Sequence, residues 1–114
     1  MEPIRGDALR GHLETMILSS LERSEAHGFE VLRRLEAAGC GVLHLKEGSL
    51  YPALYRLEAA GFIKGKWQDA AEPRCGPRRR IYSLTRKGTR RLDQGRTEWR
   101  MFVQVVGGIL GAPA

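Results

Sequence analysis

Residues 47–63 read EGSLYPALYRLEAAGFI, and this stretch decides the fold. An apolar stripe on a helix repeats at i, i+3, i+4 and i+7. Apolar residues occupy those positions here, as Leu50, Ala53, Leu54 and Leu57. The opposite side carries groups able to form hydrogen bonds, on Ser49, Tyr51, Tyr55 and Arg56. The stretch therefore predicts a helix over residues 48–60 with one buried face and one hydrogen-bonding face.

The residue types at the two ends of this helix mark where it begins and stops. Ser49 is of the kind that caps a helix N-terminus, and Pro52 lies early enough to be tolerated. Gly61 ends the helix, because glycine readily takes the left-handed conformation that follows one. Residues 62–67, FIKGKW, then begin a basic strand. A short helix with a polar outer face that leads into a basic strand is typical of a winged helix-turn-helix.

Two further helices are predicted before this one. Helical spacing of apolar residues covers residues 8–23. A second helix covers residues 28–38, with an apolar set of Phe29, Val31, Leu32 and Leu35. Residues 39–41, GCG, end it, because two glycines in three residues favour a left-handed turn. Residues 42–45 alternate only loosely and could form a very short strand that pairs with the wing.

Two strands are expected after the third helix, over residues 62–68 and 79–84. The segment between them, DAAEPRCGPR, holds two prolines and one glycine and is too long for a tight turn, so we expect it to be the wing. In the first strand, alternation places Lys64 and Lys66 on one face. Trp67 then lies on the other face, where it is expected to belong to the core.

Thr85 is predicted to cap a last helix that continues to about residue 110. Its apolar positions fall in heptad rows and are Leu92, Trp99, Phe102, Val103, Val106, Ile109 and Leu110. A chain of this size leaves little for so broad an apolar face to pack against, so we expect a partner subunit to cover it. The alternative is that the helix folds back on its own core.

The predicted fold is mainly α with a small β-hairpin, in the α+β class. A winged helix-turn-helix would span residues 8–84, and a C-terminal dimerisation helix would span residues 85–110. The length of 114 residues suits one domain, and an apolar fraction of 42% is enough to form a core. Wholesale disorder is therefore not expected.

Positive charge is concentrated in the second half of the chain. Residues 1–60 hold seven Lys or Arg and nine Asp or Glu, whereas residues 61–100 hold twelve and four. The basic residues gather around the predicted strands and the start of the last helix, which favours a side that faces a polyanion. A solvated basic face is the alternative interpretation.

Catalysis, metal binding and a membrane span find little support in the sequence. His12, His27 and His44 are scattered, and neither a nucleophile–base spacing nor a phosphate-loop motif occurs, so no enzyme, metal or cofactor is expected. Cys40 and Cys75 are isolated, either as two free thiols or as a redox-sensing disulfide.

No run approaches the roughly 18 apolar residues of a membrane span, and the N-terminus lacks a signal pattern. A cytoplasmic location is expected, with association to the nucleoid when DNA is bound.

Short motifs stand in the order just described, at residues 27–29 (HGF), 48–58 (GSLYPALYRLE), 61–63 (GFI), 67 (W), 79–88 (RRIYSLTRKG) and 98–100 (EWR). With them the chain resembles the PadR family of bacterial transcriptional regulators over roughly residues 8–110. The GSLYPAL run is the most specific of these motifs. The wing departs from the family pattern, because residues 72–77, EPRCGP, are longer and richer in proline than the usual basic turn.

The resemblance implies a sequence-specific transcriptional regulator that binds double-stranded DNA. It implies a homodimeric repressor whose two recognition helices and wings bind a palindromic operator, and a single C-terminal helix looks like the compact subfamily. A hydrophobic small-molecule effector or another signal would release it. The alternatives are a winged-helix module for protein–protein interaction, and a ligand or redox sensor that does not read an operator directly.

Hydroxyl and cationic side chains are the expected DNA contacts. A helix N-terminus favours phosphates, which places Ser49 and Tyr51 near the backbone. Tyr55 and Arg56 are expected to reach base edges, where arginine can pair with guanine. The alternatives for Arg56 are a phosphate contact or an ion pair within its own helix. Further phosphate or minor-groove contacts are expected from Lys46, Lys64, Lys66, Arg78, Arg79 and Arg80, although Arg80 could instead point to solvent.

The last helix supplies the candidate dimer interface or ligand cavity, with Trp99, Phe102, Val103 and Val106. In the family that the chain resembles, a tryptophan at this place lies near the two-fold axis and in some members flanks a hydrophobic cavity. An aromatic residue on an apolar helix stripe more often serves only for packing. Both roles are therefore kept open for Trp99.

Overall fold

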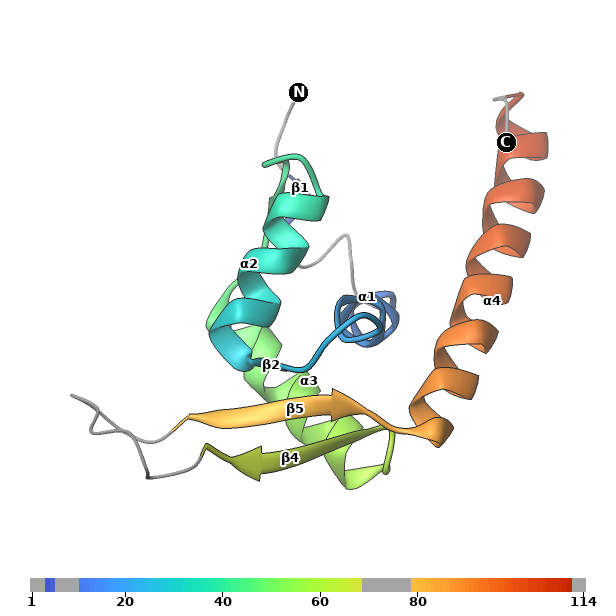
Figure 1. Cartoon of the computed structure of the whole chain (residues 1–114). Helices are drawn as coiled ribbons and strands as arrows, with labels where there is room; N and C mark the ends of the chain where they lie inside the picture. Colours follow the sequence, from blue (N-terminus) through green and yellow to red (C-terminus); the bar gives the residue numbers. More distant parts are fainter. Residues whose placement is uncertain (1–3, 6–10, 69–78, 112–114) are drawn as a thin grey trace.

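The computed structural model describes residues 4–5, 11–68 and 79–111. The elements in chain order are β1 (Ile4–Arg5), α1 (Leu13–Ser20), β2 (Ala26–His27), α2 (Gly28–Ala38), β3 (Leu43–His44), α3 (Glu47–Ala59), β4 (Ile63–Trp67), β5 (Arg80–Leu84) and α4 (Arg86–Leu110). Helices α1 and α2 lie above the β4–β5 hairpin, α3 crosses behind the hairpin, and α4 rises at one side (Figure 1). The predicted winged-helix α+β fold is confirmed.

The core lies among the first three helices and the start of the hairpin. On α3 the predicted stripe is confirmed, since its four members are at most 1% exposed, namely Leu50, Ala53, Leu54 and Leu57. Ile17 from α1, Val31 from α2 and Ile63 from β4 close over this stripe. Burying an aliphatic side chain of this kind stabilises a fold by about 1.5–3 kcal/mol. The apolar stripe on α3 thus fixes which side of the helix remains outside.

Helix α2 has the predicted bounds, but its apolar set differs by one residue. Phe29 is 49% exposed, so its assignment to the buried set is wrong. The buried positions are Gly28, Val31, Leu32 and Leu35. At 100° per residue, Phe29 falls to the side of that stripe, whereas Gly28 falls within it. The ring of Phe29 consequently faces outward from the first turn of α2.

The ends of α1 and α3 differ from the prediction. Helix α1 ends at Ser20 rather than residue 23, because the Ser20 hydroxyl bonds to the Ile17 carbonyl and the next amides form tighter i to i−3 bonds. The predicted start, residues 8–10, lies outside the described residues. Helix α3 begins at Glu47 behind Lys46, which makes no side-chain cap bond. The prediction that Ser49 caps α3 is therefore wrong, since Ser49 already lies within the first turn.

The sheet contains one strand that the sequence did not predict. Its order is β2-β5-β4, and all neighbours are antiparallel. Along the hairpin, Ile63 faces Leu84 near α4, and Trp67 faces Arg80 at the opposite end of the ladder. Strand β3 pairs in parallel with β1. The expected pairing of residues 42–45 with the wing involves residues 69–78, which lie outside the described residues. Residues 26–27 occupy the edge of β5.

The start of α4 is joined to the end of α3. The Thr85 side chain accepts a bond from the Gly88 amide as the predicted cap, and its hydroxyl lies 2.7 Å from the Gly61 carbonyl oxygen. Gly61 itself has φ +82°, the left-handed turn predicted to end α3. Lys87 Nζ donates to the Ala60 carbonyl oxygen at 2.7 Å. This lysine opposes the dipole of its own helix but complements the negative C-terminal end of α3.

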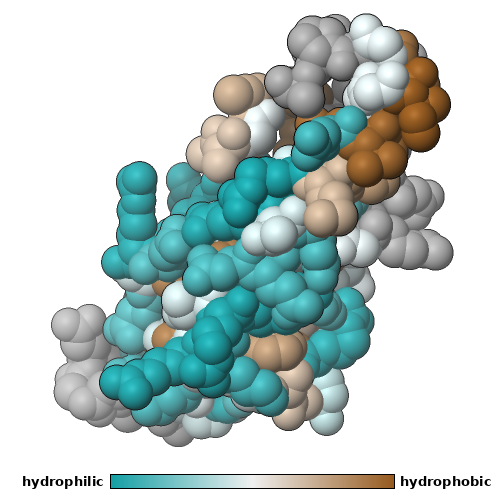
Figure 2. All heavy atoms as spheres, turned by 90° about the vertical axis from the view of Figure 1, so that its right-hand side faces the viewer, coloured by the Kyte–Doolittle hydropathy of each residue, from teal (hydrophilic) through white to brown (hydrophobic). Residues whose placement is uncertain are grey.

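Only the first part of α4 packs against the rest of the described chain through buried residues, which are Gly88, Leu92 and Gly95. Beyond them, the large apolar side chains are exposed, including Trp99 (48%), Phe102 (50%) and Ile109 (78%). Figure 2 shows hydrophobic surface gathered at one end of the molecule, where the end of α4 lies. Within the described residues, no helix combines the length and apolar character needed to cross a bilayer. The predicted boundary between residues 84 and 85 stays a prediction.

Candidate nucleic-acid interface

The outer face of α3 presents hydroxyl groups to solvent. Tyr55 is 76% exposed and Tyr51 is 43% exposed. Ser49 and Lys46 are also exposed, at the N-terminal end of the helix. A helix N-terminus carries a partial positive charge and unpaired amides, so this end suits phosphate oxygens. The structure thus leaves these four predicted contacts exposed on α3 or directly before it, and their role in DNA binding stays a prediction.

Tyr51 is held in place by α2, a contact that the sequence did not predict. A side-chain carbon built on Gly28 would lie 2.6 Å from Cε1 of the Tyr51 ring. The ring therefore lies directly against the α2 backbone, which only glycine permits at this distance. Gly28 follows His27, whose side chain accepts a hydrogen bond from the Glu30 backbone amide and so caps α2. The HGF motif at residues 27–29 was the available signal for this close approach.

Arg56 forms an ion pair between helices. Its Nε lies 3.0 Å from Oε1 of Glu14 on α1, and both side chains are substantially exposed. An acidic partner within its own helix was one alternative expected for Arg56, but the partner comes from α1. Exposed ion pairs of this kind stabilise a folded protein by about 0–1 kcal/mol. A guanine or phosphate could therefore replace Glu14 as the partner of Arg56 with little loss of folding stability. The base-reading role of Arg56 stays a prediction.

Strand β4 follows the predicted alternation except at its end. Lys64 and Lys66 are exposed, whereas Ile63 is buried. Trp67 is 54% exposed, so its predicted place in the core is wrong. It lies at the end of β4 opposite Arg80, whose guanidinium carbon is 5.2 Å from the indole centroid.

The three arginines predicted after the wing have different surroundings. Arg78 lies outside the described residues. Arg79 is exposed, and its Nη1 lies 3.1 Å from Nε2 of His27 on β2. Arg80 is half-buried and bonds to both carboxylate oxygens of Glu58 on α3, so the alternative in which it points to solvent is wrong. Hydrogen bonding to Glu58 raises the pKa of Arg80, against a smaller opposing effect of desolvation.

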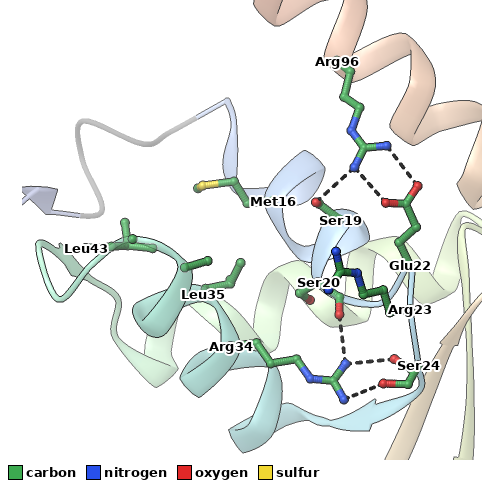
Figure 3. A pocket seen from close by; sticks show the side chains of 12 residues that line it. Met16, Ser19, Ser20, Glu22, Arg23, Ser24, Arg34, Leu35, Leu43 and Arg96 are labelled. Atoms are coloured by element: carbon green, nitrogen blue, oxygen red, sulfur yellow. Dashed lines mark hydrogen bonds and ion pairs between the residues drawn. The ribbon is translucent and has the colours of Figure 1, made fainter.

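Two hollows flank α1, and both are bordered by Arg96 of α4. The larger, about 750 Å³, has an apolar side that includes Met16, Leu35 and Leu43 (Figure 3). Arg96 bridges its rim by bonding to Glu22 at 2.9 and 3.0 Å. This contact lowers the pKa of Glu22, chiefly through the hydrogen bond from Arg96. The pair therefore joins α4 to the end of α1.

The smaller hollow, about 380 Å³, lies between α1 and α4, and Trp99 forms part of its wall. The Trp99 and Phe102 rings are stacked with centroids 5.8 Å apart, and His12 meets both edge-on. Val103 and Val106 are half-exposed further along the same helix. The structure thus places these four predicted residues on an incompletely covered face, and their roles in ligand binding or dimer formation stay predictions.

Other site chemistry is sparse in the described part of the chain. Among residues 11–68 and 79–111, no three His, Cys, Asp or Glu side chains are grouped so as to hold a metal ion. Cys40 is exposed in the turn after α2, and Cys75 lies outside the described residues, so the redox alternative is not tested. The exposed hydroxyls and cations of α3 and β4 remain the best-supported site.

Known transcriptional regulators are similar to this chain in sequence and in fold. The model of the transcriptional regulator PadR-like family matches residues 17–94. A transcriptional regulator from Clostridium thermocellum is similar with a TM-score of 0.81 at 30% identity, covering 92% of this chain and 96% of that chain. A PadR-like transcriptional regulator from Bacillus cereus has a TM-score of 0.75 at 30% identity, covering 95% and 100%. An uncharacterized protein of Lysinibacillus sphaericus is 26% identical over 103 residues, which is 90% of this chain and 92% of that protein.

Proposed function

Because the chain belongs to the PadR-like family of transcriptional regulators, we propose that it is a homodimeric repressor that binds a palindromic operator. The family consists of DNA-binding regulators of transcription rather than enzymes, and this chain regulates transcription by binding DNA. The observation that carries the proposal is the exposed hydroxyl-bearing face of α3, with Tyr51 and Tyr55 outward above a fully buried stripe. The major groove of DNA is wide enough to admit such a helix.

The cations around α3 supply the attraction to the DNA backbone. Lys46 precedes the helix, while Lys64 and Lys66 are exposed on the strand that follows it. Each lysine that neutralises a phosphate releases condensed counterions, so binding should weaken steeply as salt rises. Phosphate contacts fix the register of the protein, and base contacts from Tyr55 and Arg56 would select the sequence.

The dimer is proposed from the second half of α4. The apolar side chains from Trp99 to Leu110 include six large residues that are 48–78% exposed. Continuous apolar surface of this kind on a small protein marks an interaction site, and a second copy of the same helix would cover it symmetrically. Two recognition helices in a symmetric dimer would then meet two half-sites about 34 Å apart, as a palindrome requires.

An effector is proposed to act where α1 meets α4. The hollow beside Trp99 also touches Met16 and Leu92, so its wall is largely apolar. A hydrophobic small molecule placed there would change the angle between the two helices and hence the spacing of the two α3 helices in the dimer. Quenching of tryptophan fluorescence by a series of hydrophobic compounds would identify such a molecule, and release of DNA by the same compound would identify it as an effector.

The test of the repressor is binding to the duplex upstream of the protein's own gene, compared with a scrambled duplex of equal length at several salt concentrations. We expect a preference of roughly a thousandfold or more for the operator, a strong salt dependence, and two subunits per duplex. The variant Arg56→Ala should reduce that preference if Arg56 reads a base. An equal fall in affinity for both duplexes would make Arg56 a phosphate contact only. Weak, equal binding of the wild-type protein to both would favour a target elsewhere or a protein partner.

A further inference from the structure

Glu58 and Arg80 form a two-point contact between α3 and the hairpin. Arg80 Nε lies 3.2 Å from Oε1 of Glu58, and a second guanidinium nitrogen bonds to Oε2. The two side chains are only 32% and 29% exposed, so they are partly shielded from water. Two parallel bonds between an arginine and a carboxylate fix direction as well as distance. The contact therefore restrains orientation, unlike the single-bonded and more exposed pair of Arg56 and Glu14.

The backbone of β4 is shaped to admit this pair. A side-chain carbon built on Gly65 would lie 2.6 Å from Arg80 Nε and 2.8 Å from Glu58 Oε1. The ion pair thus lies directly on the strand at the one position without a side chain. A glycine inside a strand often marks such a close approach. On the outer side, the Trp67 ring covers the guanidinium at 5.2 Å, so the arginine is held between the carboxylate and the indole.

The position of Arg80 along the ladder explains what the pair can control. The turn at Gly61 ties α3 to the near end of the hairpin, where Ile63 faces Leu84. Arg80 faces Trp67 at the other end of the described ladder and reaches back to Glu58. The chain connection fixes one end of the hairpin against α3, and the ion pair fixes the other end.

We propose that Glu58 and Arg80 are positioning residues that set the angle between the recognition helix and the β4–β5 hairpin, so that they determine operator affinity without touching DNA. The inference rests on the proposed function, because it assumes that α3, Lys64 and Lys66 engage one duplex together. An inserted helix and flanking phosphate contacts can form simultaneously only if their relative placement is fixed in advance. Arg80 is thereby withdrawn from the set of direct DNA contacts.

The variants Glu58→Gln and Arg80→Gln separate positioning from contact by the sign of their effects. As positioning residues, each should weaken operator binding by roughly tenfold, a size typical of coupling between neighbouring charged groups. The slope of log affinity against log salt should not change, because the same lysine–phosphate contacts form in the complex and only the cost of ordering the hairpin against α3 is added. If Arg80 touched a phosphate, Arg80→Gln would reduce the slope by about 0.9. Glu58→Gln would then release the guanidinium and strengthen binding, and either result would overturn the proposal.

Three further variants control this comparison. Lys64→Gln, on the exposed face of the same strand, should reduce the salt slope by about 0.9 and weaken operator and scrambled DNA alike. Gly65→Ala retains both charges but displaces the pair, so it should reproduce the loss seen in Glu58→Gln. The double variant Glu58→Gln/Arg80→Gln should bind no more weakly than either single variant. Additive losses, or full affinity in Gly65→Ala, would contradict the proposal.

Hydrogen exchange tests the same pair without DNA. The Gln68 amide donates to the Arg79 carbonyl oxygen at 2.7 Å beside Arg80, and the Thr85 amide donates to the Phe62 carbonyl oxygen at the opposite end. Glu58→Gln and Arg80→Gln should speed exchange at Gln68 and leave Thr85 unchanged. If the wild-type protein shows no operator preference, the proposed repressor fails, and exchange at Gln68 alone decides the positioning role. Unchanged exchange at Gln68 would overturn it.

Discussion

The two halves of α4 belong to one continuous helix but differ in what covers them. In the first half, small or aliphatic residues meet the rest of the chain, and Gly88, Leu92 and Gly95 are buried. In the second half, large apolar residues such as Ile109 and Leu110 are 78% and 73% exposed. The first half is therefore stabilised within the protomer, whereas the large apolar side chains of the second half remain exposed and, in the proposed dimer, would be covered by the partner. The difference shows that an apolar heptad pattern alone does not reveal which part of a helix packs internally.

Leu92 and Ile109 offer the largest contrast between the two halves. Leu92→Ala should lower the free energy of unfolding by about 3–4 kcal/mol, because Leu92 is 0% exposed and its removal leaves a cavity. Ile109→Ala should change the stability of the dissociated protomer by less than about 0.5 kcal/mol. It should instead weaken self-association, measured by sedimentation equilibrium. Comparable losses in denaturant unfolding of dilute protein would show that the second half also packs within the protomer.

Two glycines sharpen the same comparison with a smaller change. A methyl group on Gly88 would lie 1.9 Å from the Phe62 carbonyl oxygen, whereas nothing lies within 4 Å of one on Gly108. Gly88→Ala should destabilise the protein by about 2–3 kcal/mol, since backbone must move to relieve the clash. Gly108→Ala should stabilise the helix by up to about 1 kcal/mol. Thermal unfolding followed by circular dichroism measures both, and a tolerated Gly88→Ala would refute the close packing of α4 on the turn between α3 and β4.

The smallest expected effect concerns the ion pair at the boundary between the halves. The hydrogen bond from Arg96 lowers the pKa of Glu22 below its ordinary value of 4.5. A carboxyl whose pKa is lowered by folding stabilises the fold above its unfolded pKa and loses that contribution as pH falls through the folded pKa. The melting temperature of wild-type protein should therefore exceed that of Glu22→Gln at neutral pH.

This advantage should shrink as the pH falls below 4.5. Glu98→Gln provides a matched control, because its carboxylate lies 4.0 Å from Arg91 within α4 and joins no second element. A difference between wild-type protein and Glu22→Gln that does not vary with pH would contradict the proposed contribution of the pair.

The sequence predicted the fold wherever one local pattern sufficed. The i, i+3, i+4, i+7 stripe placed α3 within one residue, and Thr85 was recognised as the cap of α4. The errors arise where distant segments decide. Alternation predicted a buried Trp67 after an exposed Lys66, but Trp67 is exposed, and the Arg80 guanidinium that lies over its ring comes from thirteen positions later. Residues 26–27 carry no strand pattern of their own and pair only because β5 offers an edge.

The candidate site shows the same division between residue type and residue placement. The sequence identified which cations and hydroxyls could bind DNA, and the structure places most of those it describes on the surface. It could not show that Arg56 pairs with Glu14 on another helix, or that Arg80 pairs with Glu58. Both partners come from other elements, at separations of 42 and 22 residues, where no local spacing rule applies. Within the described part of the candidate site, Gly28 and Gly65 were local signs of close contacts.

The hydrogen bonds from Thr85 to Gly61 and from Lys87 to Ala60 tie the start of α4 to the end of α3. Helix α4 has 25 residues and is about 37 Å long, so a small change in its angle at this junction becomes a large displacement of its far end. A tilt of roughly 5° at the junction moves the C-terminal end of α4 by about 3 Å. Conversely, a partner subunit that held the apolar end of α4 would restrain the orientation of α3, because an uncertainty of about 3 Å at that end corresponds to a tilt of only roughly 5° at the junction.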